Sequence, residues 1–158
     1  WGVCLDDDGD VYVADWGNDR VQRFTADGDY LMSFGSSKEA GADLDHPCAV
    51  AVDSDGDVYV SDWGNRRVQV YEPQGEVITA LYGDVNRLSK ATEYALSRND
   101  GIYRNVFDSI HDALTRVKEF DRPGGLVVDD QDRIIITDSC GRLQVYVKDN
   151  DWVDPVPA

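Results

Sequence analysis

The residues of this sequence that could do chemistry are mostly carboxylates, and many of them stand in short turns. Residues 6–10 (DDDGD) and 53–57 (DSDGD) have the acidic start of a calcium-binding loop. Both lack the regularly spaced acceptors and the final Glu of an EF-hand. Asp and Gly also suit tight turns, because Asp caps its own turn and Gly tolerates a positive φ. We therefore predict turns and no cofactor, with weak surface binding of calcium as the alternative.

The sequence offers no complete set of residues for metal or nucleophilic catalysis. Cys4, Cys48 and Cys140 lack metal-ligand spacing. The sequence also has no Ser/His/Asp set and no phosphate loop. His46 stands directly before Pro47, and a single histidine does not make a metal site. We predict no catalytic residue and no metal ligand, and we keep His46 as a candidate binding residue.

Tryptophan and its neighbours are better candidates for ligand binding. The loop sequence DWGN occurs twice, at 15–18 and 62–65. Repeated aromatic residues on one face favour a binding rim, since Trp contributes strongly to interfaces. The alternative is that each ring packs against a neighbouring structural unit. The candidate binding residues are Trp16, Asn18, His46, Trp63, Asn65 and Arg66.

The candidate residues stand within a unit that repeats three times along the sequence, and the strands of that unit must position them. Copies at 2–24, 49–71 and 125–146 share an apolar run, an Asp-rich turn, a β-branched strand, a loop and an alternating strand. With one further strand, each copy gives four antiparallel strands joined by tight turns, which is typical of a β-propeller blade. An Asp and an Arg recur in every copy, and we interpret each pair as a structural pin of its loop. The pairs are Asp15 with Arg20, Asp62 with Arg67, and Asp138 with Arg142.

The succession of an apolar strand, DGDVYV, Asp-x-Gly-Asn-x-Arg and VQVY resembles the NHL repeat. The resemblance covers residues 1–83 and 122–147, and it implies an all-β propeller that has six blades in most members. The third copy departs from the pattern, because DSCGR is one residue shorter than DWGNRR and lacks the Asn. Amidating lyases, which resemble this family, place metal-binding His near the central channel. The resemblance also favours an extracytoplasmic location.

We predict one propeller segment over residues 1–158, with blades at 1–35, 48–83 and 122–158 and an insertion at 84–121. Apolar residues at helical spacing predict an α-helical hairpin in the insertion, over about 86–98 and 103–119. We expect its apolar stripe to pack on the propeller. Pro155 and Pro157 argue against an outer strand in the last blade, because Pro cannot donate to a strand ladder.

Three blades cannot close a ring, since propellers have about 4–8 blades. Two arrangements supply the remaining blades of the ring. The chain is the C-terminal half of a longer protein that contains the remaining blades, or two copies close the ring as a homodimer.

The charge excludes several classes of partner. The net charge is −16, so there is no basic stripe for nucleic acid and no polybasic surface for a membrane. In a four-stranded meander, the acidic turns gather at one end and the Trp-bearing loops at the other. The sequence therefore favours a non-enzymatic binding scaffold for a protein, a peptide or a small ligand, using the end with the Trp loops and the insertion. The alternative is a propeller enzyme of lyase or lactonase type, with metal ligands partly in other blades.

Overall fold

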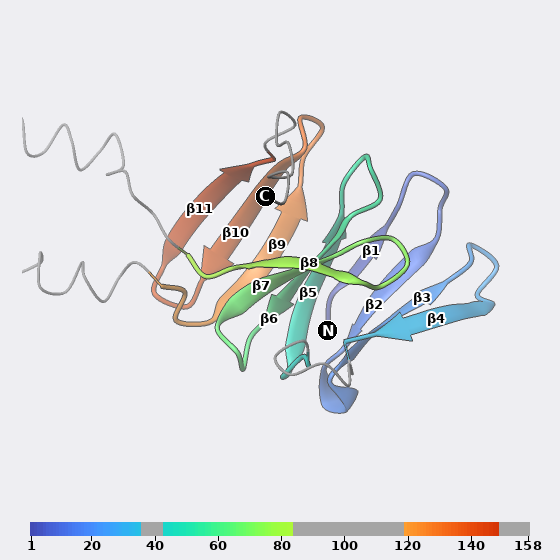
Figure 1. Ribbon diagram of the computed structural model, residues 1–158, viewed down its shortest axis with the longest axis horizontal. Helices are drawn as coiled ribbons and strands as arrows, with labels where there is room; N and C mark the ends of the chain where they lie inside the picture. The colour runs from blue at the N-terminus through green and yellow to red at the C-terminus, as the bar shows by residue number, and fades with distance from the viewer. Residues whose placement is uncertain (36–42, 84–118, 149–158) are drawn as a thin grey trace, which may run out of the picture.

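Three antiparallel sheets lie side by side in this protein (Figure 1). The structure is a computed structural model, and it describes residues 1–35, 43–83 and 119–148. The helical hairpin predicted over about 86–98 and 103–119 lies outside the described residues, apart from its last position, Glu119. Within the described part of the chain, no helix has the length and apolar character needed to cross a membrane.

Each sheet is one blade, with its strands paired in chain order. Blade one contains β1 (Val3–Leu5), β2 (Val11–Asp15), β3 (Arg20–Phe24) and β4 (Tyr30–Phe34). Blade two contains β5 (Pro47–Val52), β6 (Val58–Asp62), β7 (Arg67–Tyr71) and β8 (Val77–Leu81). Blade three contains β9 (Pro123–Val128), β10 (Arg133–Asp138) and β11 (Arg142–Val147). An outer strand of blade three would fall on residues 149–158, which the structure does not describe. The prediction of an all-β propeller segment is confirmed.

The Asp-rich turns form because one carboxylate holds the backbone of each. The Oδ1 atom of Asp53 accepts hydrogen bonds from the amides of Asp55, at 3.1 Å, and Asp57, at 2.9 Å. Gly56 supplies the positive φ of 86° that the turn requires. Asp6 and Asp129 make equivalent bonds in the other two blades. Turn formation thus accounts for the first Asp of each acidic motif.

Two apolar clusters join the blades. Blades one and two share a cluster that includes Tyr12, Val21, Val58 and Tyr71. Blades two and three share another that includes Tyr59, Val68, Phe120 and Ile136. All residues of β6 and β7 are buried, because blade two is covered on both flanks.

The apolar run that opens each copy of the repeat predicts an innermost strand that is buried on both faces. This prediction is wrong for blade one. Val3 and Leu5 are 64% and 65% exposed. Both lie on the flank that faces away from blade two, which no other described blade covers.

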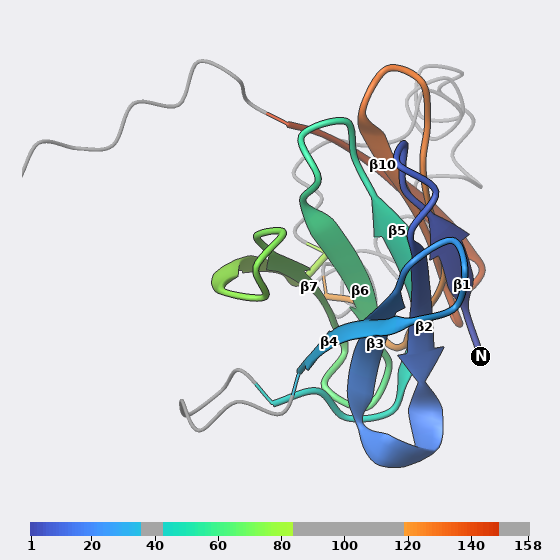
Figure 2. The ribbon, with the colours of Figure 1, turned by 90° about the vertical axis from the view of Figure 1, so that its right-hand side faces the viewer.

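The two kinds of loop lie at opposite ends of the sheets. The β1–β2, β5–β6 and β9–β10 turns lie along the upper edge of Figures 1 and 2, and the β2–β3 and β6–β7 loops lie at the lower edge. We call these the acidic end and the tryptophan end. The β7–β8 turn belongs to the acidic end, because a Cβ built on Gly56 would lie 3.1 Å from Pro73 Cγ.

Candidate binding site

The recurrent Asp–Arg pairs hold the loops of the tryptophan end. Arg67 Nε donates to Asp62 Oδ2 at 2.8 Å, and Arg20 Nε donates to Asp15 Oδ2 at the same distance. In blade three, Arg142 Nη2 donates to Asp138 Oδ2. The three predicted pairs are therefore in direct contact. They differ in burial, since Asp62 is fully buried and Asp15 is only half-buried.

The asparagines of these loops use their amide groups within the loop. Asn18 Nδ2 lies 2.9 Å from both carboxylate oxygens of Asp15, and Asn65 Nδ2 lies 2.9 Å from Asp62 Oδ2. Hydrogen bonds from Arg20 and Asn18 hold the pKa of Asp15 below its ordinary value. Both asparagines, predicted as binding residues, thus have donors engaged in shaping the loop.

Blade three lacks this Asn, and backbone donors take its place. Burial alone would raise the pKa of Asp138. The amides of Cys140 and Asp121, together with Arg142, stabilise the charged form and lower the pKa instead. The one-residue shortening of the third copy therefore leaves the carboxylate well supplied with donors.

The same carboxylates anchor the segment that enters the next innermost strand. The amide of Asp45 donates to Asp62 Oδ1 at 2.8 Å, and the amide of Asp121 donates to Asp138 Oδ2 at 3.0 Å. An Asp-x-Pro motif recurs here as Asp45-His46-Pro47 and Asp121-Arg122-Pro123. The anchoring places the middle residue of each motif at the tryptophan end.

Aromatic rings form a row across this end. The ring centroids of Trp1 and Trp16 are 5.2 Å apart, and those of Trp16 and Trp63 are also 5.2 Å apart. His46 meets Trp16 edge-on, with centroids 4.9 Å apart, and the Arg122 guanidinium carbon lies 4.1 Å from the centroid of Trp63. Trp16 and Trp63 are half-buried. Each ring therefore packs across a blade junction, and part of it remains accessible to a ligand.

Two carboxylates lie beside this row at the junction of blades one and two. Asp19 Oδ1 accepts a hydrogen bond from the amide of His46 at 2.8 Å, and His46 Nδ1 contacts Asp45 Oδ1. The carboxylate atoms of Asp19 and Asp45 and a ring nitrogen of His46 all lie within 4.8 Å of one another. A Cβ on Gly64 would lie 2.2 Å from the Asp45 carboxylate, so the glycine makes room for that group next to Trp63.

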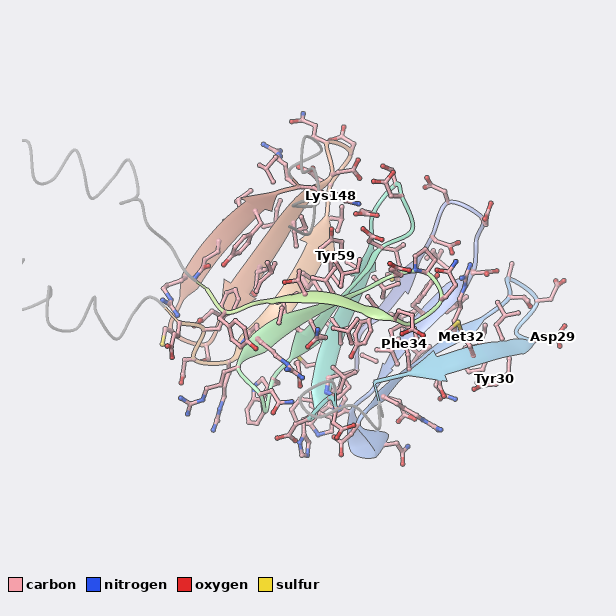
Figure 3. All side chains as sticks on the ribbon, viewed as in Figure 1. Asp29, Tyr30, Met32, Phe34, Tyr59 and Lys148 are labelled. Atoms are coloured by element: carbon pink, nitrogen blue, oxygen red, sulfur yellow. The ribbon has the colours of Figure 1, made fainter. Side chains whose placement is uncertain are left out.

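At the acidic end, cations of the chain itself occupy the turns. Lys148 Nζ lies 3.0, 2.8 and 2.7 Å from carboxylate oxygens of Asp53, Asp55 and Asp57. Burial alone would lower the pKa of Lys148, but the three carboxylates raise it well above its ordinary value. Tyr59, which donates to Asp53 Oδ2, lies below Lys148 in Figure 3. The ammonium group thus fills the position between the carboxylates of blade two.

The other two turns are also partly neutralised. Arg23 contacts Asp6 at 3.2 Å and Asp10 at 2.9 Å, and Arg133 contacts Asp129 at 2.6 Å. These internal pairs make the acidic end less strongly charged than its composition suggests.

Sequence reasoning brought Trp16, Trp63 and His46 into one site but missed four of their neighbours. Trp1, Asp19, Asp45 and Arg122 contribute to the row or to the carboxylate pair. The recurrent Asp-x-Pro motif could have revealed Asp45 and Arg122. Arg66, another predicted binding residue, is exposed, and its side chain makes no hydrogen bond or ion pair with the described residues. No repeat signal marks Asp19, because blade two has Arg66 at that position.

The model of the NHL repeat matches residues 1–24, 44–71 and 120–147, which together make up half of the chain. These ranges include all three Asp–Arg pairs, the first three strands of blades one and two, and the three described strands of blade three. No curated protein matches the sequence significantly.

Two lyases are among the solved structures with a similar fold. The virginiamycin B lyase from Staphylococcus aureus has a TM-score of 0.51 and 13% identity over 92% of this chain and 40% of its own. A streptogramin B lyase has a TM-score of 0.53 and 10% identity over 94% of this chain and 40% of its own. This chain therefore spans about two fifths of the length of these lyases. At such identities the likeness concerns the fold alone.

Proposed function

The chain belongs to the NHL-repeat family, and we propose that it acts as a non-enzymatic scaffold that binds a protein, a peptide or a small ligand at its tryptophan end. The observation that carries this proposal is the row of Trp1, Trp16 and Trp63, with successive centroids 5.2 Å apart and rings that are not fully buried. Rigid aromatic rings contribute large contact areas with little loss of side-chain entropy.

The contrast between the two ends supports the choice of surface. The turns of the acidic end are short, and several of their carboxylates are already paired with Lys148, Arg23 and Arg133. The Asp–Arg pairs hold the loops of the tryptophan end in place. Loops that a rigid scaffold holds in place are where binding sites usually lie. The net charge of −16 argues against nucleic acid as the partner.

Selection of phage-displayed random peptides on the full chain tests the proposal. Peptides that bind the wild type should bind the Trp16→Ala/Trp63→Ala variant at least about tenfold more weakly, because central Trp residues dominate interface energies. The melting temperature of this variant should change little, since both rings lie at the surface of the blade junctions.

Charge reversal of Asp7, Asp55 and Asp130 to Lys provides the control. These substitutions change the acidic end and should leave peptide binding intact. If the reversals abolish binding and the Trp variant retains it, the binding surface lies at the other end.

A metal-dependent lyase is the second candidate. One observation favours it, namely the Asp19–Asp45–His46 set of possible metal ligands. Similar donor sets hold divalent metals in enzymes, and the further ligands would come from other blades. Isothermal titration of the full chain with Zn²⁺ or Mn²⁺ tests this function. Binding that His46→Ala abolishes would support it.

A further inference from the structure

We propose that the junction of blades one and two recognises an arginine side chain of a peptide ligand, through Trp16, Asp19 and Asp45. This inference rests on the proposed binding function and names the chemistry of its ligand. The site is the surface formed by the exposed part of the Trp16 ring and by the two carboxylates beside it.

Asp19 and Asp45 carry negative charge, and neither forms an ion pair with a lysine or an arginine among the described residues. The ion-pair partner of Asp19 and of Asp45 among the described residues is His46. The side chains of Asp19 and Asp45 are 52% and 49% exposed. One oxygen of each contacts His46, and no described donor reaches the other. Two half-exposed carboxylates with free oxygens attract a cationic group.

The aromatic row supplies the second element of recognition, and the chain contains its own example. At the junction of blades two and three, the Arg122 guanidinium carbon lies 4.1 Å from the Trp63 ring centroid. Trp16 has the same place in blade one, but its neighbour in the equivalent motif is the His46 ring, which meets it edge-on. Trp16 also contacts the Trp1 and Trp63 rings, so a guanidinium would make this kind of cation–π contact on the part of the Trp16 ring that stays exposed.

The two junctions differ in charge, which would orient the ligand. Blade one has Asp19 where blade two has Arg66, and both take a left-handed backbone conformation, with φ of 51° and 57°. The residue before the strand proline is His46 at the first junction and Arg122 at the second. The first junction therefore carries Asp19, Asp45 and His46, whereas the second carries Asp121 with Arg66 and Arg122. The excess of carboxylates at the first junction directs an arginine of the ligand to it.

A guanidinium suits this site better than a point charge. Its planar face stacks on an indole ring, while its edge donates two parallel hydrogen bonds to a carboxylate. Lysine offers a compact ammonium group that uses only the charge. We therefore expect binding in the order arginine, lysine, citrulline at the central position of one peptide.

The experiment titrates ¹⁵N-labelled full chain with acetyl-Gly-Gly-Arg-Gly-Gly-amide and with the citrulline peptide, which has nearly the same shape and no charge. The Trp indole signals are followed, and Trp16→Phe assigns the signal of Trp16. The arginine peptide should shift that signal and bind about tenfold more tightly than the citrulline peptide. Added salt should reduce the difference.

Matched variants separate this recognition from a general effect of charge. Asp19→Asn/Asp45→Asn keeps the shape of both side chains and should remove the preference for arginine. Asp7→Asn/Asp8→Asn makes the same change of net charge at the acidic end and should preserve it. Equal affinity for the two peptides would overturn the inference, and so would a preference that survives in Asp19→Asn/Asp45→Asn.

The outcomes distinguish this inference from the proposed function. If selected peptides require Trp16 and Trp63 but show no preference for arginine, the tryptophan end binds ligands and the arginine site is wrong. If Zn²⁺ binds the wild type but not Asp19→Asn/Asp45→Asn, and the two peptides bind alike, the carboxylates serve a metal ion and the inference is wrong.

Discussion

The Asp62 carboxylate holds three separate parts of blade two together. It accepts hydrogen bonds from Arg67 Nε, from Asn65 Nδ2 and from the amide of Asp45. The side chain of Asp62 is fully buried, and that of Arg67 is 9% exposed. Removal of one partner from such a pair leaves a buried charge without compensation, which costs more than the pair contributes to stability.

We predict that Asp62→Ala lowers the free energy of unfolding by about 1–3 kcal/mol, because it removes the carboxylate that accepts hydrogen bonds from Arg67, Asn65 and the Asp45 amide. Asp15→Ala is the matched control, since Asp15 and Arg20 are partly exposed and such pairs contribute less than about 1 kcal/mol. Urea denaturation of both variants measures the difference. Equal losses in the free energy of unfolding would mean that the burial of an Asp–Arg pair does not determine how much its removal destabilises the chain.

The Asp–Arg pairs could be predicted from the sequence because they recur in every copy of the repeat. The carboxylate pair of Asp19 and Asp45, at the junction of blades one and two, could not. The same structural need exists in every blade, so Asp62 and Arg67 have counterparts in each copy. The pairing of Asp19 with Asp45 depends on one position at which blade one differs from blade two. It also depends on a contact between blades, which the repeat pattern of a single blade does not contain.

At the scale of elements, the acidic turns and the strands around them join neighbouring blades. Lys148 follows β11 of blade three and reaches the β5–β6 turn of blade two. Ser54 Oγ donates to Asp132 Oδ2 at 2.7 Å between the turns of the same two blades. The turns themselves were predictable from their Asp and Gly residues. Their partner was not, because Lys148 lies outside the three copies of the repeat.

We predict that Lys148→Met destabilises the chain by about 1–3 kcal/mol and makes its stability depend on calcium. The variant leaves Asp53, Asp55 and Asp57 without their cation, and Ca²⁺ prefers several carboxylate oxygens. Melting temperatures with and without millimolar CaCl₂ measure the effect, because a cation that binds only the folded chain stabilises it by mass action.

Arg133→Met is the comparison for this prediction, because Arg133 faces a single carboxylate of Asp129. Its melting temperature should respond much less to calcium. A Lys148→Met protein that ignores calcium would show that the three carboxylates do not form a cation site.

The two outer flanks of the described blades are apolar and exposed. Blade three exposes Val127, Leu143, Val145 and Val147, and blade one exposes Val3 and Leu5. The equivalent flanks of blade two are buried by its neighbours. Exposed apolar patches of this kind mark surfaces that another structure covers. We propose that further blades cover them, from a longer polypeptide or from a second copy of this chain.

We predict that the 158-residue chain alone associates in solution. Size-exclusion chromatography with light scattering should show dimers or larger species. Leu143→Lys/Val145→Lys, which places charges on the outer flank of blade three, should shift the population toward monomer. A monodisperse wild-type monomer that melts cooperatively would contradict the prediction.

Blades two and three are held together by residues on both sides of positions 84–118, and this has a consequence for engineering. Cys48 Sγ donates to the carbonyl of Pro123, Ser54 bonds Asp132, and Lys148 bonds three carboxylates of blade two. These contacts join described residues on either side of positions 84–118, so we expect them to hold blades two and three together when a reporter domain is inserted at those positions. A fluorescent protein inserted between positions 84 and 118 should therefore leave the two blades in contact.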